Sequence, residues 1–347
     1  MFALVQFNLN KVANQMNKRY LLISLFFVIV LLTIINYRTP FFRQDGGGWS
    51  LGYGSATSFP EKITIDAKNI YSIEKLKAQN DSTVFLADPF FVKEKDTFYI
   101  FFEHATIKSH ADIGLLTSID GKNYQYRGTV LSQKFHLSYP QVFKYRNDFY
   151  MVPESKQANA ILLYKAHRFP YDWRVCDTLV NNVQLVDPSL YLSDSLNIMV
   201  ATDYAKNMYV YEADSLLGKW KLHKKPIALI GTESRAGGRF FADKKGLILP
   251  VQDFSKGYGY GVSLYRFLFK DGNYKIRREK PLFLAANKNI KEFNAGMHQL
   301  DIQRLDDAHY YYVYDGNRLN NDAKTLNLWG PLKWNYLDLK NWLLQNF

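Results

Sequence analysis

The sequence predicts an all-β protein, a five-bladed β-propeller, preceded by a single N-terminal transmembrane helix. Three observations support this prediction. An uncharged apolar stretch lies near the N-terminus, helical periodicity is scarce in the ~300 residues that follow, and a unit of about 50 residues recurs five times. The chain of 347 residues is long enough for one large domain or two ordinary ones, and its 47% apolar and 16% aromatic content can fill a sizeable core.

The transmembrane helix is predicted over residues 20–37, which contain no charged side chain. This stretch is close to the ~20 residues that a helix needs to cross a bilayer. Lys18 and Arg19 precede it, so we expect residues 1–19 to form a cytoplasmic head and the propeller to lie on the extracytoplasmic side. No cleavage site of small residues follows, which favours an uncleaved signal-anchor. Translation could start at the first methionine or at Met16.

The boundaries of the propeller follow from the composition on either side of it. Residues 38–48 are typical of a linker because they contain Pro40 and three consecutive glycines. The propeller is assigned to residues 49–320, and residues 321–347 are expected to form a C-terminal extension with a short helix. We expect this helix to pack on the propeller rather than lie on a membrane, and one of its faces carries Leu339, Leu343 and Phe347.

Each recurring unit begins with an apolar strand that follows a proline or a residue in its place. These positions are Pro89, Pro140, Pro188, Gly238 and Asp301. A polar turn and a second strand come next, and the second strand ends in a carboxylate 14 or 15 residues after the first position. The carboxylates are Glu103, Glu154, Asp203, Asp253 and Asp315. Most units continue with a third strand and then an aromatic residue that opens a fourth, which is the strand content of a propeller blade.

The order of the strands predicts where the polar residues meet. The first strand of a blade lines the central axis and the second runs back beside it, so the start of one and the end of the other lie at the same face. This face is the mouth of a central funnel. The segment WSLGYG at residues 49–54 is expected to close the ring by joining the last blade.

Ten residues at this funnel mouth are candidates for a functional site. The catalytic candidates are Asp88, Glu103, Glu154 and Asp187, and the substrate-binding candidates are His136, Tyr139, Arg235, Arg239, Asp253 and His298. Carboxyl groups in one concave site raise one another's pKa, and such pairs suit glycosidic bond chemistry. Asp88 is then the candidate base or nucleophile, and Glu154 or Asp187 the candidate acid. In the alternative interpretation, the acids at the strand ends cap turn amides or pair with basic neighbours.

The composition argues against several other kinds of protein. Cys176 is the single cysteine, which rules out an internal disulfide framework and a multi-thiolate zinc site. The net charge of +12 is scattered, without a run of five basic residues, so nucleic acid is not an expected partner. No ligand spacing demands a metal ion, and the sequence identifies no cofactor.

Many motifs of the chain, in order, resemble those of one known domain. They include FLADPFF, FYIFFEH, FHLSYPQVF, FYMVPES, LVDPSLY, RAGGRFF and GMHQLD. From about residue 49 to residue 316 the chain resembles the propeller domain at the N-terminal side of plant glucosamine inositolphosphorylceramide transferases, which also stands alone in bacterial proteins. The resemblance implies a glycan or glycolipid substrate and a membrane-anchored topology. The glycosyltransferase domain of the plant proteins has no counterpart in this sequence, so a separate glycosyltransferase is a possible partner.

That domain is similar in turn to the five-bladed propellers of arabinanases, β-xylosidases and fructosidases. The hydrolase pattern implies inward carboxylates on the first strands of three successive blades: a base Asp, a pKa-tuning Asp and an acid Glu. Here these positions are Asp88, Tyr139 and Asp187, so the middle carboxylate is missing. Two functions therefore remain open. The chain is a carbohydrate-active enzyme acting on a glycosidic bond of an envelope or lumenal glycan, or a non-catalytic glycan-binding module that assists a separate glycosyltransferase.

Overall fold

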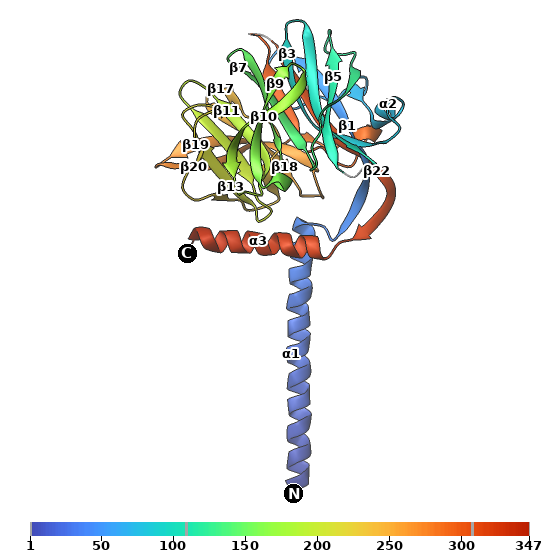
Figure 1. The fold of residues 1–347 in the computed structure, drawn as a ribbon. Coiled ribbons are helices and arrows are strands. Elements are labelled where there is room, and N and C mark those ends of the chain that lie inside the picture. The colour runs from blue at the N-terminus through green and yellow to red at the C-terminus, as the bar shows by residue number, and fades with distance from the viewer. Residues whose placement is uncertain (1, 108–109, 307–308, 347) are drawn as a thin grey trace.

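Five antiparallel sheets surround a central axis in the computed structural model of the chain, which describes residues 2–107, 110–306 and 309–346 (Figure 1). The long helix α1 (Phe2–Arg38) projects from them as a stalk. Within it, Lys18–Arg38 is long and apolar enough to cross a membrane, with a mean hydropathy of 2.4. The predicted five-bladed propeller with one N-terminal apolar helix is confirmed.

Each blade is a sheet whose strands are hydrogen-bonded to their neighbours in a meander. Blade 1 consists of β3 (Thr83–Glu94), β4 (Thr97–Thr106), β5 (Ala111–Ser118) and β6 (Gln125–Leu131). Blade 2 consists of β7 (Ser138–Tyr145), β8 (Asp148–Glu154), β9 (Ala160–Arg168) and β10 (Tyr171–Asn181). Blade 3 consists of β11 (Val186–Leu192), β12 (Asn197–Thr202), β13 (Asn207–Glu212), β14 (Lys221–Leu222) and β15 (Ile227–Ala228). Blade 4 consists of β16 (Glu233–Ala236), β17 (Phe241–Asp243), β18 (Gly246–Asp253), β19 (Gly261–Lys270) and β20 (Asn273–Ala285).

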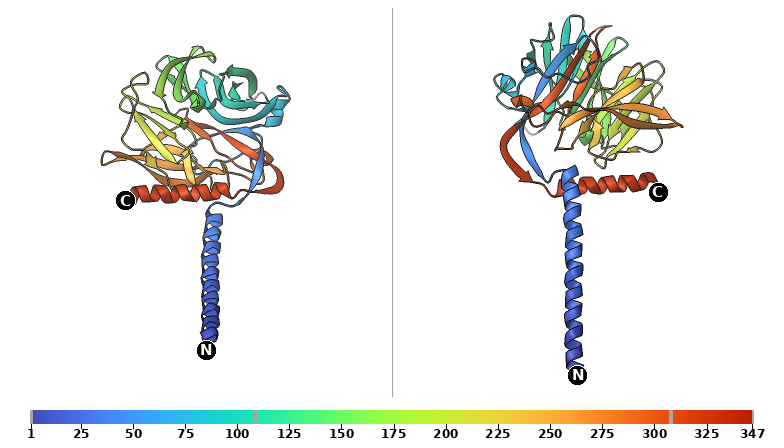
Figure 2. Two further views of the ribbon diagram at one scale, coloured as in Figure 1. Left: turned by 60° about the horizontal axis from the view of Figure 1, so that its bottom comes forward. Right: turned by 180° about the vertical axis from the view of Figure 1, so that it is seen from behind.

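Blade 5 closes the ring with strands from both ends of the propeller. It consists of β21 (Leu300–Arg304), β22 (Tyr310–Leu326), β1 (Phe42–Ala56) and β2 (Ile70–Tyr71). β1 pairs with β22 in a register that brings Trp49 opposite Asn317 and Ala56 opposite Tyr310, so the expected closure by residues 49–54 is confirmed. β1 begins at Phe42, and strand pairing therefore extends into the segment expected to be a linker. This pairing closes the ring with many backbone hydrogen bonds, because two long strands lie side by side (Figure 2).

The first strands of the blades contact one another around the axis. β3 contacts β7 and β21, β7 contacts β11, and β11 contacts β16. The remaining junction is made by the backbone of Leu300, whose N–H donates to the carbonyl oxygen of Gly237 at 2.8 Å. The axis is therefore packed with strands, and any cavity on it lies where these strands begin or end.

The apolar core fills the spaces between neighbouring blades. One cluster lies between blades 5 and 1 and includes Leu51, Phe98 and Tyr311, and similar clusters separate blades 2 and 3 and blades 4 and 5. Alternate residues of the strands are aromatic or branched, which suits the pleated surface of a sheet. Each fully buried large apolar side chain contributes roughly 1.5–3 kcal/mol, so the blade interfaces hold the ring together.

Three short helices lie at the edges of the propeller: α2 (Ile73–Lys77), η1 (Lys156–Ala158) and η2 (Lys291–Phe293). A longer helix, α3 (Trp329–Asn346), follows β22 and lies crosswise at the propeller end of α1, between α1 and the blades (Figure 1, Figure 2). One side of α3 packs on the propeller, with Leu337, Asp338 and Asn341 buried. Leu339 and Leu343, which were expected to share a face, are exposed, and Phe347 lies outside the described residues.

Candidate functional site

Four of the five inner strands begin with the same irregularity. The pairing with the second strand shifts between Ala87 and Phe90, and it does so at the matching positions of blades 2, 3 and 4. In each case two residues of the inner strand oppose one residue of its neighbour, which defines a β-bulge. The repeated residue–proline pairs of the sequence mark these bulges in blades 1 to 3.

Each bulge holds a non-glycine residue in the left-handed region of the backbone. These residues are Asp88 (φ 50°), Tyr139 (φ 49°), Asp187 (φ 52°) and Arg235 (φ 69°). Such conformations cost on the order of 1–3 kcal/mol each and cluster at functional sites. In blade 4 the sequence repeat places Gly238 in the position of the prolines, which is wrong. The register pairs Glu233 with Asp253 and Ala236 with Val251, so the bulge of blade 4 consists of Ser234 and Arg235. Arg235 takes the place of the proline, and here the second bulge residue has the left-handed φ.

A cavity of about 550 Å³ opens at the axial end where the bulges converge. Six of the predicted site residues line it: Asp88, Glu103, His136, Glu154, Arg235 and His298. They come from bulges, from the ends of second strands, and from the segments that precede β7 and β21. Several buried carboxyl groups and a guanidinium therefore share one concave site, as the strand order predicted.

His298 lies between two carboxyl groups at the bottom of this site. Its Nδ1 is 2.7 Å from Oδ2 of Asp315 and its Nε2 is 3.6 Å from Oδ1 of Asp88. Burial alone would lower the pKa of His298, but the two carboxylates raise it to about 9. For the carboxyl of Asp88, burial acts in the opposite direction and raises the pKa well above its ordinary value, although the His298 imidazolium opposes this rise. Trp49 stacks on the imidazole with ring centroids 4.1 Å apart, so the ring is held from its face as well.

The same three residues are the group within the described chain whose geometry could hold a metal ion. Their ligand atoms all lie within 4.8 Å of one another. Asp315, however, already accepts hydrogen bonds from the backbone N–H groups of His298 at 2.9 Å and of Asp88 at 3.0 Å. A protonated imidazole has no lone pair for a metal, so His298 would have to lose its proton first. As the residues stand, the imidazolium is the counter-ion of the carboxylates.

Asp187 is tied to Arg235 rather than turned to the cavity. Arg235 donates from Nε to Oδ2 of Asp187 at 2.6 Å and from Nη2 to Oδ1 at 3.0 Å, and Gln252 donates to Oδ2 at 3.0 Å. Both carboxylate oxygens are therefore engaged by neighbouring side chains, and the side chain is buried. The expectation that Asp187 acts as the acid loses its structural support, because its charge is already compensated.

Glu154 is a cavity carboxyl whose pKa lies near neutral pH. Burial, followed by the charge of Asp187, raises the pKa of Glu154 to about 7, and the guanidinium of Arg235 limits the rise. Its Oε2 accepts a hydrogen bond from the backbone N–H of Asp187 at 3.4 Å. A carboxyl with a pKa close to the working pH can both donate and accept a proton.

Glu103 and His136 form an ion pair at the rim of the cavity. Nε2 of His136 is 3.0 Å from Oε1 of Glu103, and the hydrogen bond to that carboxylate raises the pKa of His136. The backbone N–H of His136 donates to Oε1 of Gln157 at 2.9 Å. Lys156 lies beside them and donates to the hydroxyl of Tyr204 at 2.6 Å. The rim is therefore polar and carries charges of both signs.

Three further predicted residues do not line the cavity. Tyr139 is fully buried, and its hydroxyl accepts from the backbone N–H of Gly238 at 2.6 Å and lies 2.7 Å from Oγ of Ser189. Arg239 lies further along the axis, where its Nε donates to Asp301 at 2.9 Å. Asp253 accepts from the backbone N–H of Ser255 at 2.6 Å. All three stabilise turns or inner strands. Asp253 caps a turn amide, which is the structural role that the alternative interpretation gave to acids at strand ends.

Several cavity residues were not identified from the sequence. They are Trp49, Phe85, Ala87, Ser138, Lys156, Gln157, Tyr204 and Tyr258. Trp49 opens the closing segment WSLGYG, and Tyr258 lies in the aromatic and glycine-rich loop SKGYGYG, so both stretches carried a signal. Their rings meet edge to face with centroids 6.2 Å apart. They add an aromatic wall to a site otherwise lined by charges.

A five-bladed propeller with an acidic cavity at one end of its axis is the class of protein that this fold and site define. The chain belongs to the family described as glucosamine inositolphosphorylceramide transferase 1, N-terminal, whose model matches residues 65–317. It is 35% identical over 340 residues to glucosamine inositolphosphorylceramide transferase 1 of Oryza sativa subsp. japonica, covering 86% of this chain and 45% of the relative. The Arabidopsis thaliana protein of the same name is 32% identical over 308 residues, covering 80% and 40%. The chain thus spans less than half the length of these relatives.

Solved structures share the fold at low sequence identity. An α-L-arabinofuranosidase from Podospora anserina, in complex with cellotriose, matches with a TM-score of 0.50 and 10% identity, over 78% of this chain and 98% of that one. A putative glycoside hydrolase from Parabacteroides distasonis matches with a TM-score of 0.51 and 13% identity, with the same coverage. These matches confirm the resemblance to propellers of the glycoside hydrolase type at the level of the fold.

Proposed function

We propose that the axial cavity binds a glycan and that Glu154 and Asp88 act on a glycosidic bond within it. The observation that carries the proposal is the convergence of three buried carboxyls, Asp88, Glu103 and Glu154, on one cavity. The names of the relatives support a glycan, because each is called a glucosamine inositolphosphorylceramide transferase. Trp49 and Tyr258 offer apolar ring faces beside the charges, which suits the mixed polar and apolar surface of a sugar.

The two carboxyls take different roles because their surroundings differ. Glu154, with a pKa of about 7, is protonated often enough to donate its proton to the leaving glycosidic oxygen. Asp88 must be ionised to accept the proton of the attacking water or hydroxyl. Burial raises its pKa, and the neighbouring His298 opposes that rise by favouring the carboxylate form. Glu103, fixed by His136, is placed to accept hydrogen bonds from sugar hydroxyls.

A non-catalytic glycan-binding module beside a separate glycosyltransferase is the second candidate. Two of the three inner-strand positions that carry carboxylates in hydrolase propellers offer no free carboxyl here. Tyr139 occupies one and is buried, and Asp187 at the other is paired with Arg235. The cavity then binds the sugar without breaking a bond.

One experiment separates these functions. The full chain in detergent or lipid nanodiscs is incubated with a panel of glycans, and both binding and product release are measured. Turnover that is lost in Glu154→Gln and Asp88→Asn while binding persists supports the enzyme, with the exposed Glu61→Gln as the matched control. Binding without turnover that is lost in Trp49→Ala supports the module. Absence of both from the whole panel would rule out both functions.

For the topology we propose that α1 anchors the chain in a membrane with the propeller on the extracytoplasmic side. Lys18 and Arg19 at the start of the candidate span support this orientation. Cys176, the single cysteine, is exposed on blade 2 and reports the side of the propeller. A membrane-impermeant maleimide should label it in intact cells or spheroplasts. Labelling only after permeabilisation would contradict the orientation.

A further inference from the structure

We propose that α3 lies in the surface of the bilayer that α1 crosses and holds the cavity mouth against it. This proposal rests on the proposed membrane anchor. In this proposal the lipid surface contacts the apolar face of α3 that the propeller leaves exposed.

The two faces of α3 differ in what they contact. The propeller side carries residues 331, 334, 338, 341 and 345, spaced by three or four. Asn341 donates to the carbonyl oxygen of Leu229 at 3.0 Å and Trp334 to that of Gly231 at 3.0 Å. Asp338 forms an ion pair with the buried Lys206. Polar groups thus fix α3 to the loop of residues 203–207 and to the segment at 228–231.

The outward side of α3 carries a stripe of apolar residues at the same spacing. They are Trp329 (83% exposed), Leu332, Tyr336 (64% exposed), Leu339 (57% exposed) and Leu343 (44% exposed), with Leu332 partly exposed. Because successive helical residues advance by about 100°, this stripe lies opposite the side that contacts the propeller. Lys333 and Lys340 flank it and are exposed. A helix that lies in a membrane interface typically has one face of leucine, tryptophan and tyrosine with lysines along its borders.

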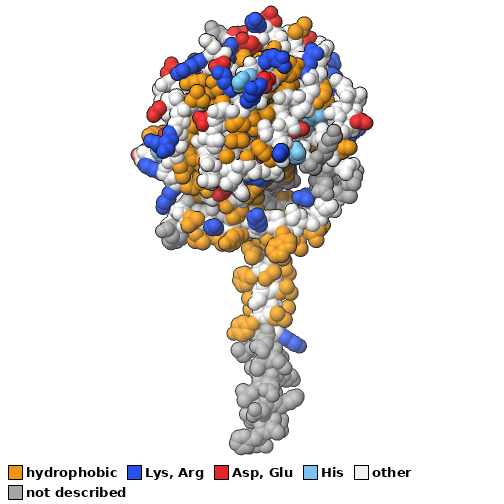
Figure 3. Space-filling view, in the orientation of Figure 1, with side chains coloured by type: hydrophobic (Ala, Val, Ile, Leu, Met, Phe, Trp, Pro, Cys, Tyr) orange, Lys and Arg blue, Asp and Glu red, His pale blue; other side chains and the backbone are white. Residues whose placement is uncertain are grey.

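The end of the candidate span is fastened to α3. Arg38, the last residue of α1, lies 2.5 Å from Oδ2 of Asp338 and donates to Oδ1 of Asn335 at 3.0 Å. Asn335 in turn donates to the hydroxyl of Thr39 at 2.8 Å. A helix bonded to the residue where the span ends lies at the level of the lipid headgroups, and α3 runs crosswise to α1 there (Figure 1). In Figure 3 apolar side chains gather on this underside of the propeller, directly above the apolar stalk.

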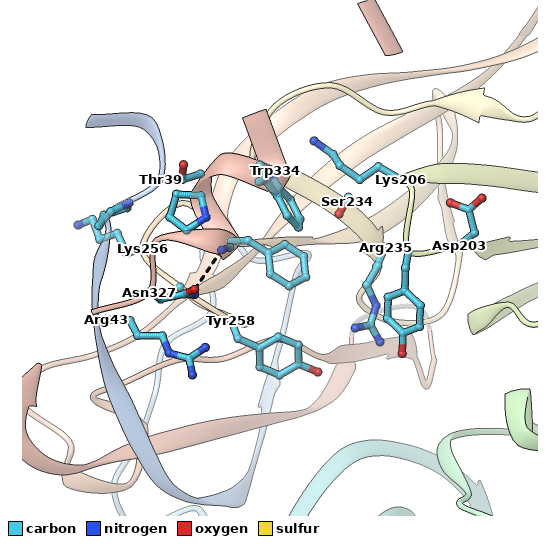
Figure 4. A pocket seen from close by; sticks show the side chains of 16 residues that line it. Thr39, Arg43, Asp203, Lys206, Ser234, Arg235, Lys256, Tyr258, Asn327 and Trp334 are labelled. Atoms are coloured by element: carbon cyan, nitrogen blue, oxygen red, sulfur yellow. Dashed lines mark hydrogen bonds between the residues drawn. The ribbon is translucent and has the colours of Figure 1, made fainter. Parts of the chain in front are cut away.

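The cavity mouth opens on the same side as α3. A second pocket of about 290 Å³ lies between α3, the start of the linker and blades 3 and 4 (Figure 4). Tyr204, Arg235 and Tyr258 line both this pocket and the axial cavity, so the two are neighbours. The second pocket has apolar walls that include Phe254 and Trp334, whose ring centroids are 5.1 Å apart.

The basic residues of the second pocket suit a lipid headgroup. They are Arg43, Lys206, Arg235 and Lys256. Lys206 and Arg235 are paired with Asp338 and Asp187, whereas Lys256 is exposed. Basic side chains at a bilayer surface attract anionic headgroups. In the proposed arrangement this second pocket therefore opens onto the lipid headgroups.

Depth measurements on the full chain in anionic lipid nanodiscs test the proposal. In a Cys176→Ser background, nitroxide labels are placed by Leu339→Cys on the outward stripe, by Val28→Cys within the span, and by Asp96→Cys on the β3–β4 turn. The Leu339 site is exposed, so labelling it leaves the fold intact. We expect the label at 339 to collide with lipid-soluble oxygen more than with a water-soluble nickel chelate, as at 28, and the reverse at 96.

The outcomes separate this proposal from the anchor on which it rests. If the labels at 28 and 339 are both in water, the anchor itself fails. If 28 lies in lipid and 339 is as accessible to the nickel chelate as 96, the anchor stands and the surface role of α3 is overturned.

Discussion

Asp187 and Arg235 join the bulges of blades 3 and 4 through two hydrogen bonds of 2.6 and 3.0 Å. Both residues have left-handed backbone conformations, with φ of 52° and 69°. The pair neutralises a carboxylate that a hydrolase propeller would turn to the substrate, and it sets the electrostatic field at Glu154. One ion pair therefore stabilises the ring and tunes the candidate acid.

Asp187→Asn should destabilise the protein strongly. It removes one partner of a buried ion pair and leaves the Arg235 charge uncompensated, which costs about 3–5 kcal/mol. Asp172→Asn is a matched control, because Asp172 also has a left-handed φ, 53°, and pairs with Arg174 at an exposed site. Denaturant midpoints of both variants check the prediction. Equal small losses would show that the buried pair contributes no more than the exposed one.

Glu154→Gln should change how stability depends on pH. The pKa of Glu154 is raised from 4.5 to about 7, so the stability of the wild type relative to the variant is highest below pH 4.5 and is lost as the pH rises through 7. The full change is roughly 3 kcal/mol, from 1.36 kcal/mol per pKa unit. Denaturant midpoints at several values from pH 4 to pH 9 measure it. A difference that stays constant with pH would refute the raised pKa.

Tyr139→Phe should cost about 1–3 kcal/mol, because the buried N–H of Gly238 loses its acceptor. Tyr164→Phe is the control. Tyr164 is equally buried, and its hydroxyl finds no hydrogen-bond partner within the part of the chain that the structure describes. The control substitution should be neutral or stabilising in thermal unfolding. If the two variants unfold alike, the Tyr139 hydroxyl does not hold the axis together.

Gly238→Ala should destabilise the protein at the junction between blades 4 and 5. Gly238 has φ 151°, and a Cβ there would lie 1.8 Å from the carbonyl oxygen of Leu300. Gly246→Ala has φ 118° but meets no atom within 4 Å, so it carries backbone strain alone. The first variant should lose roughly 1–3 kcal/mol more than the second, the usual cost of overpacking. Similar unfolding midpoints would show that the junction yields to the added methyl group.

Much of the architecture was predictable because it depends on local chemistry. Each unit repeats a strand, a turn and a strand with a spacing of 14 or 15 residues from its first position to its carboxylate. Proline after Asp88, Tyr139 and Asp187 marks the bulges of three blades. Blade 4 has no such proline, so the place of its bulge, at Ser234 and Arg235, emerged only from the pairing of Glu233 with Asp253 and of Ala236 with Val251. The sequence therefore predicted the fold class, but it did not predict the strand register of blade 4.

The candidate site was predictable as a set of positions and not as a set of roles. The strand order brought Asp88, Glu103 and Glu154 to one end of the axis. Which carboxyl stays free depends on partners distant in sequence, such as Arg235 for Asp187 or His298 for Asp88. Such contacts cross blades, and the spacing of residues within a blade carries no information about them.

The sequence by itself determined the repeat, the apolar span and the apolar stripe through Leu339 and Leu343, because periodicity and charge are local properties. Only the tertiary structure decided which side of α3 faces the propeller. Asp338 and Asn341 find a buried lysine and a backbone carbonyl on blade 3 and the segment beyond it, and these polar contacts turn the stripe outward. The physical reason is that a buried polar group must be paired, and its partner here lies more than 100 residues away along the chain.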